Sequence, residues 1–135
     1  HQLGESGTSF LATPGVARKY TSGFPGSLDG APFLVPIAGS SSRRSLEYWF
    51  ERNDLHPQVV AEFEDRALMK TFGEAAAGVF AAPTAVEGEI LSKYGVRVIG
   101  RTNDVVENYY AISSERRIKH PAVSAITESA RSDLF

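Results

Sequence analysis

The fold is decided by the stretch FLVPIAGSSS, residues 33–42. Residues 33–35 form a short apolar run, which predicts a buried strand that Pro36 ends. The glycine and the three serines at 39–42 are typical of a loop that leads into a helix N-cap. The helix expected next carries three large apolar residues on one face: Leu46, Trp49 and Phe50. We therefore expect Trp49 to lie in the core.

Apolar runs and amphipathic helical patterns alternate in both directions from this stretch. Further strands are expected at 8–12, 59–63, 79–80, 96–99 and 105–113. Further helices are expected from Pro14, from Asp65 to near Gly78 with Leu68, Met69 and Phe72 inward, from a capping box at Thr84–Glu87 to Gly95, and from Pro121. This alternation predicts an α/β domain whose mostly parallel sheet is covered by helices on both faces.

Composition limits the classes of function. The chain has 135 residues, a net charge of −2 and no cysteine. One domain is expected, without disulfides, thiolate metal sites or a cysteine nucleophile. An acidic chain without a basic stripe lacks the face that holds DNA phosphates, so DNA binding by these residues is not expected. No membrane span or signal peptide is expected, and a cytoplasmic location fits the absence of cysteine.

The chemistry of a typical enzyme is missing from the sequence. The three histidines, His1, His56 and His120, lie far apart, and two of them precede prolines. There is no Gly-x-Ser-x-Gly elbow, no Walker loop and no dinucleotide-binding fingerprint. The sequence therefore predicts no catalytic activity and no cofactor.

Two stretches are candidate ligand sites. Residues 39–44 lie between the carboxyl end of a strand and the start of a helix, where free backbone N–H groups favour anions. The alternative for this loop is simple helix capping, with both arginines in water. Glu62, Glu64 and Asp65 form an acidic cluster that could bind a cation through oxygen ligands. The alternative for the cluster, which we favour, is a solvated strand edge and a helix cap.

Three stretches together resemble a known family. They are residues 27–36, residues 59–83 with their glycine-rich turn, apolar strand and Pro83, and residues 109–113 leading into the last helix. The chain resembles the effector-binding domain of LysR-type transcription regulators over essentially its whole length. Within that family, the chain is similar to the branch of sodium/proton-antiporter regulators at residues 27–36, 43–46, 67–70 with 72–73, and 110–113 with 115–121.

The resemblance implies a periplasmic-binding-protein-like sensor, in which two α/β subdomains are joined by crossing strands. Residues 1–135 would be its C-terminal part, with the second subdomain at about 14–100 and a C-terminal helix at about 121–132. Residues 3–12 and 105–113 would be the crossing strands. Because the chain starts at His1, we expect its natural start to be missing. The resemblance implies that the DNA-binding domain and most of the first subdomain are also missing.

The resemblance also implies an effector site in the cleft between the subdomains. Its residues in this half would be Pro36, Gly39, Ser40, Ser41, Ser42, Arg43, Asp65, Pro83 and Thr84. The implied function is sensing of a small molecule or ion, in an activator that responds to sodium or alkaline stress. The full-length protein would be a dimer or tetramer that binds DNA through its helix-turn-helix. The alternative is a solute-binding module of a transport system.

Overall fold

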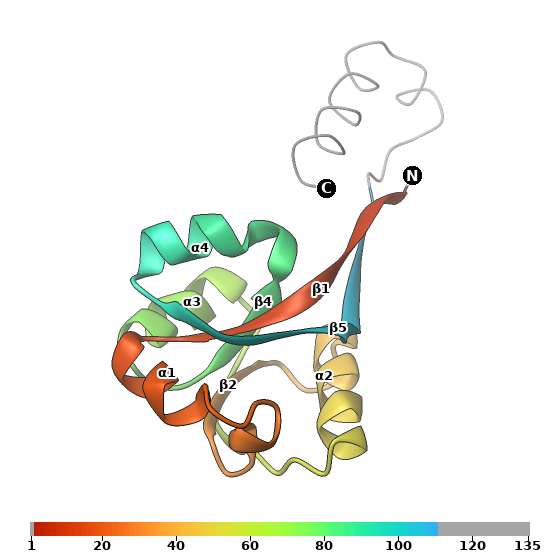
Figure 1. Ribbon diagram of the computed structural model, residues 1–135. Coiled ribbons are helices and arrows are strands. Elements are labelled where there is room, and N and C mark those ends of the chain that lie inside the picture. Colours follow the sequence, from red (N-terminus) through yellow and green to blue (C-terminus); the bar gives the residue numbers. More distant parts are fainter. Residues whose placement is uncertain (1, 111–135) are drawn as a thin grey trace, which may run out of the picture.

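The computed structural model describes residues 2–110, which form a mixed sheet with helices on both faces (Figure 1). Its strands are β1 (Gln2–Ala12), β2 (Pro32–Pro36), β3 (Gln58–Phe63), β4 (Phe80–Pro83) and β5 (Arg97–Tyr110). Its helices are α1 (Pro14–Tyr20), η1 (Gly26–Leu28), α2 (Ser41–Arg52), α3 (Arg66–Glu74), η2 (Thr84–Val86) and α4 (Glu87–Tyr94). The helix expected at 121–132 and the strand residues 111–113 lie outside the described residues.

Strand β1 is the middle strand of a three-stranded sheet, and β2 and β3 form a two-stranded sheet beside it. It pairs antiparallel with β4 on one edge and with β5 on the other, whereas β2 and β3 pair in parallel. A parallel bridge joins β2 to the residue before β4, because Leu34 N donates to Val79 O and Val79 N donates to Pro32 O, both at 2.8 Å. The prediction of an α/β fold is confirmed, but the sheet is mixed and not mostly parallel, since both pairings of β1 are antiparallel.

Alternate residues of the strands enter two separate cores, as expected for a sheet buried on both faces. Phe10, Phe33 and Val79 point to the core under α1 and α2. Leu11 and Phe80, each next to one of these residues, point to the core under α3 and α4. The prediction that helices cover both faces is confirmed.

Strand β5 is longer than expected. The strands predicted at 96–99 and 105–113 form one strand over the described residues, Arg97–Tyr110, with bulges relative to β1. A Cβ at Gly7, next to one of these bulges, would lie 2.7 Å from the carbonyl oxygen of Thr102. The two strands continue together beyond the body of the domain as far as the Gln2–Tyr110 pair (Figure 1).

Helix α2 begins and packs as predicted. Ser40 is its N-cap, and the Ser40 hydroxyl accepts a hydrogen bond from the backbone N–H of Arg43 at 3.2 Å. Trp49 is 3% exposed, and its ring stacks on Phe10 with centroids 4.9 Å apart. The prediction that Trp49 lies in the core is confirmed.

Helix α3 begins at the predicted N-cap but packs through a different stripe of residues. Asp65 accepts hydrogen bonds from the backbone N–H groups of the first turn. Leu68 and Phe72 are 48% and 44% exposed, so the expectation that they face inward is wrong. The buried residues of α3 are Met69 and Gly73, which lie one turn apart. The Phe80 ring packs directly against Gly73 and leaves no space there for a larger side chain. The helix ends at Glu74, before the expected end near Gly78.

The capping box expected at Thr84–Glu87 does not form. Residues 84–86 form the short η2 turn, and α4 starts at Glu87 without a side-chain cap. The Glu87 carboxylate instead binds the Arg101 guanidinium through two hydrogen bonds, of 2.6 and 2.8 Å, and accepts another from the buried Ser9 hydroxyl. Glu87 thereby ties α4 to both β1 and β5. Gly95 ends α4 in the left-handed conformation, as predicted.

None of the helices within residues 2–110 is long and apolar enough to cross a lipid bilayer.

Gly73 and Gly88 allow a matched test of the packing under α3. A Cβ at Gly73 would lie 2.4 Å from the fully buried Phe80 ring, so Gly73→Ala should destabilise the protein by about 1–3 kcal/mol. A Cβ at Gly88 meets nothing within 4 Å, so Gly88→Ala should stabilise the protein by about 0.5–1 kcal/mol through helix propensity. Urea denaturation followed by Trp49 fluorescence measures both changes. Stabilisation by Gly73→Ala would contradict the described packing.

Glu87 allows a test by pH. The hydrogen bond from Arg101 holds the pKa of the Glu87 carboxyl below its ordinary value, burial opposes this effect, and the Ser9 hydroxyl adds to it. A carboxyl whose pKa is lowered by folding contributes stability above its unfolded pKa and loses it as the pH falls through the folded pKa. We expect Glu87→Gln to lower the free energy of unfolding at pH 7 by about 1–2 kcal/mol and to reduce its loss between pH 7 and 3.

Denaturation at a series of pH values measures both effects of Glu87→Gln. Glu89→Gln is the control, because Glu89 is exposed on the same helix. An acid-induced loss of stability that is equal in Glu87→Gln and in the unsubstituted protein would contradict the role of Glu87.

Candidate functional site

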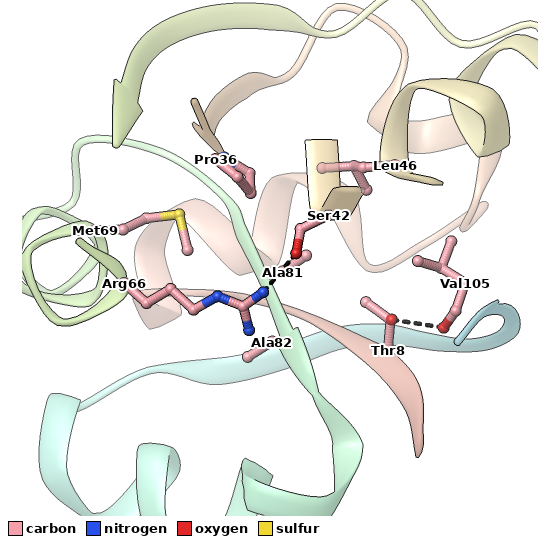
Figure 2. A pocket seen from close by; sticks show the side chains of 9 residues that line it. All are labelled: Thr8, Pro36, Ser42, Leu46, Arg66, Met69, Ala81, Ala82 and Val105. Carbon is pink, nitrogen blue, oxygen red and sulfur yellow. Dashed lines mark hydrogen bonds between the residues drawn. The ribbon is translucent and has the colours of Figure 1, made fainter. Parts of the chain in front are cut away.

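A recess lies where the carboxyl ends of β2 and β4 meet α2, α3 and the strands β1 and β5 (Figure 2). Strands β2, β3 and β4 run in the same direction, so their carboxyl ends share one edge of the sheet, the usual place for ligands in open α/β folds. The residues lining the recess are Thr8, Pro36, Ser42, Leu46, Arg66, Met69, Ala81, Ala82 and Val105.

The polar groups of the recess come mainly from the starts of two helices. Arg66, the first residue of α3, extends its guanidinium across the recess and donates a hydrogen bond to the Ser42 hydroxyl in the first turn of α2, at 2.5 Å (Figure 2). The Thr8 hydroxyl donates to the backbone oxygen of Val105 at 2.7 Å and thereby joins β1 to β5. Among residues 2–110, the lining of the recess includes one cationic group and two hydroxyls.

The floor of the recess is apolar. Leu46, Met69 and Val105 are 3%, 3% and 7% exposed. The recess as a whole has a volume of about 30 Å³, which is close to the space that one water molecule occupies. Ligand pockets usually enclose several hundred Å³. This surface can therefore form one wall of a binding site but does not enclose a ligand by itself.

Two of the residues expected at the effector site line the recess, namely Pro36 and Ser42. Gly39, with a φ of 90°, Ser40 and Ser41 belong to the preceding loop and the helix start, and they do not line it. Within this loop Ser40 caps α2, in agreement with the capping alternative for residues 39–44.

Arg43 does not line the recess. It is 8% exposed, and its guanidinium binds the Glu47 carboxylate at 2.7 Å and the Pro36 carbonyl oxygen at 2.9 Å. Its Nη1 also lies 3.3 Å from a carboxylate oxygen of Glu62. The alternative that leaves Arg43 in water is wrong, because its side chain is buried against these partners, and ligand contact by Arg43 stays a prediction.

The other expected site residues have structural partners outside the recess. Asp65 caps α3, with its carboxylate 2.8 Å from the backbone nitrogen of Ala67. Pro83 ends β4, and the Thr84 hydroxyl lies 2.9 Å from the Ser9 hydroxyl. The predicted site residues thus gather near the carboxyl ends of the strands, and of them only Pro36 and Ser42 line the recess.

Arg66 is the main residue that the sequence analysis missed. The signal that could have identified it is its place directly after the N-cap Asp65. The first residue of a helix that follows a strand lies near the carboxyl end of that strand, where ligands bind in open α/β folds. Thr8, Ala81 and Val105 were missed because only the pairing of β1 with β4 and β5 brings them to α2 and α3.

The acidic cluster does not form a cation site. Strand β3 ends at Phe63, so Glu64 lies beyond the strand. Glu62 is paired with Arg43, and Asp65 caps α3. Over residues 2–110, no group of three histidine, aspartate or glutamate side chains is arranged to hold a metal ion.

A second, larger pocket of about 310 Å³ lies between α2 and β3. Its lining residues are Val35, Arg43, Glu47, Phe50, Glu51, Asp54, Leu55, His56, Pro57 and Val59. This pocket lies on the face of the sheet opposite α3 and away from the carboxyl ends of the strands.

Comparison with known proteins connects this geometry to a family. The model of the LysR substrate-binding domain matches residues 1–134. The transcriptional activator protein NhaR of Escherichia coli K12 is 38% identical over 134 residues, which are 99% of this chain and 44% of NhaR. NhaR of Shigella flexneri matches equally well. The chain thus spans less than half the length of these relatives.

Solved structures show the same fold. The AmpR effector-binding domain of Citrobacter freundii matches 99% of this chain with a TM-score of 0.69 at 16% identity, over 66% of that domain. The AmpR effector domain of Pseudomonas aeruginosa matches 99% with a TM-score of 0.68 at 21% identity, over 65% of that domain. These similarities confirm the periplasmic-binding-protein-like fold class, and the identity to NhaR confirms the branch. The chain belongs to the LysR substrate-binding domain family.

Proposed function

We propose that this chain is the effector-sensing part of a LysR-type transcriptional activator that acts in the cytoplasm. The observation that supports this most strongly is the position of the recess. It lies at the shared carboxyl ends of the parallel strands and directly against β1 and β5. A ligand held there touches both a rigid subdomain and the strands that leave it.

In this proposal β1 and β5 are the crossing strands of a two-subdomain sensor. Residues from about Pro14 to Gly100 form the subdomain described above, and a second subdomain provides the other wall of the cleft. Membership in the family and the small volume of the recess both support a second wall. The protein regulates and does not catalyse, and it assembles as a homo-oligomer that contacts DNA through a separate helix-turn-helix.

Effector binding then controls transcription by shifting a conformational equilibrium. A ligand between the subdomains favours the arrangement to which it binds more tightly, and the shift is limited by the difference in affinity. The Thr8–Val105 hydrogen bond fastens the two strands together beside the ligand, so their directions change together. The name of the activator NhaR supports an activating role, and we propose sodium or alkaline stress as the inducing condition.

Ser42 and Ser41 provide a matched test in the full-length protein. Ser42 lines the recess, whereas its neighbour Ser41 is exposed and does not line it. A phenylalanine at position 42 should fill the recess, so Ser42→Phe should abolish induction of a reporter gene by sodium chloride at alkaline pH. Ser41→Phe should retain induction.

DNA affinity, measured by anisotropy titration of promoter DNA, should be unchanged in both variants, because neither residue belongs to the helix-turn-helix. Normal induction in Ser42→Phe would contradict the proposed position of the effector site. Failure of the unsubstituted protein to bind promoter DNA selectively would contradict the proposed function as a whole.

A further inference from the structure

The larger pocket between α2 and β3, called the α2–β3 pocket below, has the lining of a second ligand site. We infer that this pocket binds a small organic cation, such as a protonated amine that carries an aryl or alkyl group. The carboxylates of Glu51 and Asp54 attract the ammonium group, and apolar side chains hold the rest of the ligand. The inference does not rest on the proposed function, because the α2–β3 pocket and the recess share no lining residue.

The size and the apolar lining of the α2–β3 pocket suit a small organic molecule. Its volume of about 310 Å³ lies at the lower end of the range that ligand pockets usually have. Its apolar lining combines the buried side chains Val35, Phe50 and Leu55 with the exposed side chain of Val59 on β3. An aryl or alkyl group placed against them removes apolar surface from water, whereas a hydrated inorganic ion gains nothing from such a surface.

The charges of the lining favour a cation. Among the described lining residues, Glu47, Glu51 and Asp54 are carboxylates and Arg43 is the single arginine, so the net formal charge is −2 with His56 neutral. The Arg43 guanidinium is already balanced, since it lies 2.7 Å from Glu47 and 3.3 Å from a carboxylate outside the pocket lining, that of Glu62. The charge that remains in the α2–β3 pocket is therefore negative.

Glu51 and Asp54 carry this remaining charge. Within residues 2–110, no lysine or arginine forms an ion pair with either carboxylate, and Asp54 has only the exposed His56 ring nearby, at 3.7 Å. Glu51 lies in the last turn of α2 and Asp54 just beyond its C-cap Asn53. The dipole of a helix disfavours carboxylates at this end and favours cations. An ammonium group bound there compensates both carboxylates and the end of the helix.

Val59 provides a local probe, because it lines the α2–β3 pocket. The full-length protein is labelled with [methyl-¹³C]valine, and the Val59 signals are assigned with Val59→Ile. Benzylamine, which is protonated at pH 7, the uncharged benzyl alcohol and the anion benzoate are titrated at constant ionic strength. Benzylamine should shift the Val59 signals saturably, with a Kd of the order of 1 mM. Benzyl alcohol should bind at least about threefold more weakly, since two exposed carboxylates add attraction for the ammonium alone.

Matched variants separate the two carboxylates from the overall charge of the protein. Glu51→Gln combined with Asp54→Asn should remove the preference for benzylamine over benzyl alcohol. Both changes preserve side-chain shape, and asparagine tolerates the left-handed backbone of Asp54, whose φ is 53°. Glu74→Gln is the control, because Glu74 is exposed at the end of α3 and does not line the α2–β3 pocket. This control should retain the preference.

Four results would overturn the inference. The first is a Val59 signal that benzylamine does not shift, and the second is benzoate binding as tight as benzylamine binding. The third is an unchanged preference for benzylamine in the double variant, or a preference that Glu74→Gln abolishes equally. The fourth is a saturable shift of Val59 when sodium chloride replaces potassium chloride, because it would assign the α2–β3 pocket to an inorganic ion.

Discussion

The central strand β1 is hydrogen-bonded along both edges, antiparallel to β4 on one side and to β5 on the other. Its neighbouring residues Phe10 and Leu11 enter the two cores on opposite faces of the sheet. A slip of β1 by one residue would exchange these side chains between the cores, so the register is strongly specified. The helices on both faces depend on this register, because their apolar residues pack on alternate positions of the same strand.

The same pairing connects packing to function. One half of the β1–β5 pair packs within the subdomain. The other half continues beyond the body of the subdomain (Figure 1). The recess lies against them, and Thr8 and Val105 belong both to its lining and to the contact between the two strands. In the proposed mechanism, a ligand in the recess would therefore act directly on the strands that lead to the second subdomain.

The sequence predicted the local structure better than the long-range contacts. The strand at Phe33, the N-cap within residues 39–42, the N-cap Asp65 and the burial of Trp49 follow from local sequence patterns, and all were predicted correctly. The antiparallel pairing of β1 was missed because strand direction depends on residues far away in the chain. Arg43 was assigned to the site and Arg66 was not, because only the packing of α2 and α3 decides which arginine faces the recess.

The central claim is that this subdomain forms one wall of a closed effector cleft. An experimental structure of the full-length protein tests it most directly. We expect a second α/β subdomain, attached through β1 and β5, to lie opposite the recess, so that Ser42 and Arg66 face a cavity large enough for a small organic molecule. A structure in which the recess faces solvent, with the second subdomain packed elsewhere, would contradict this claim.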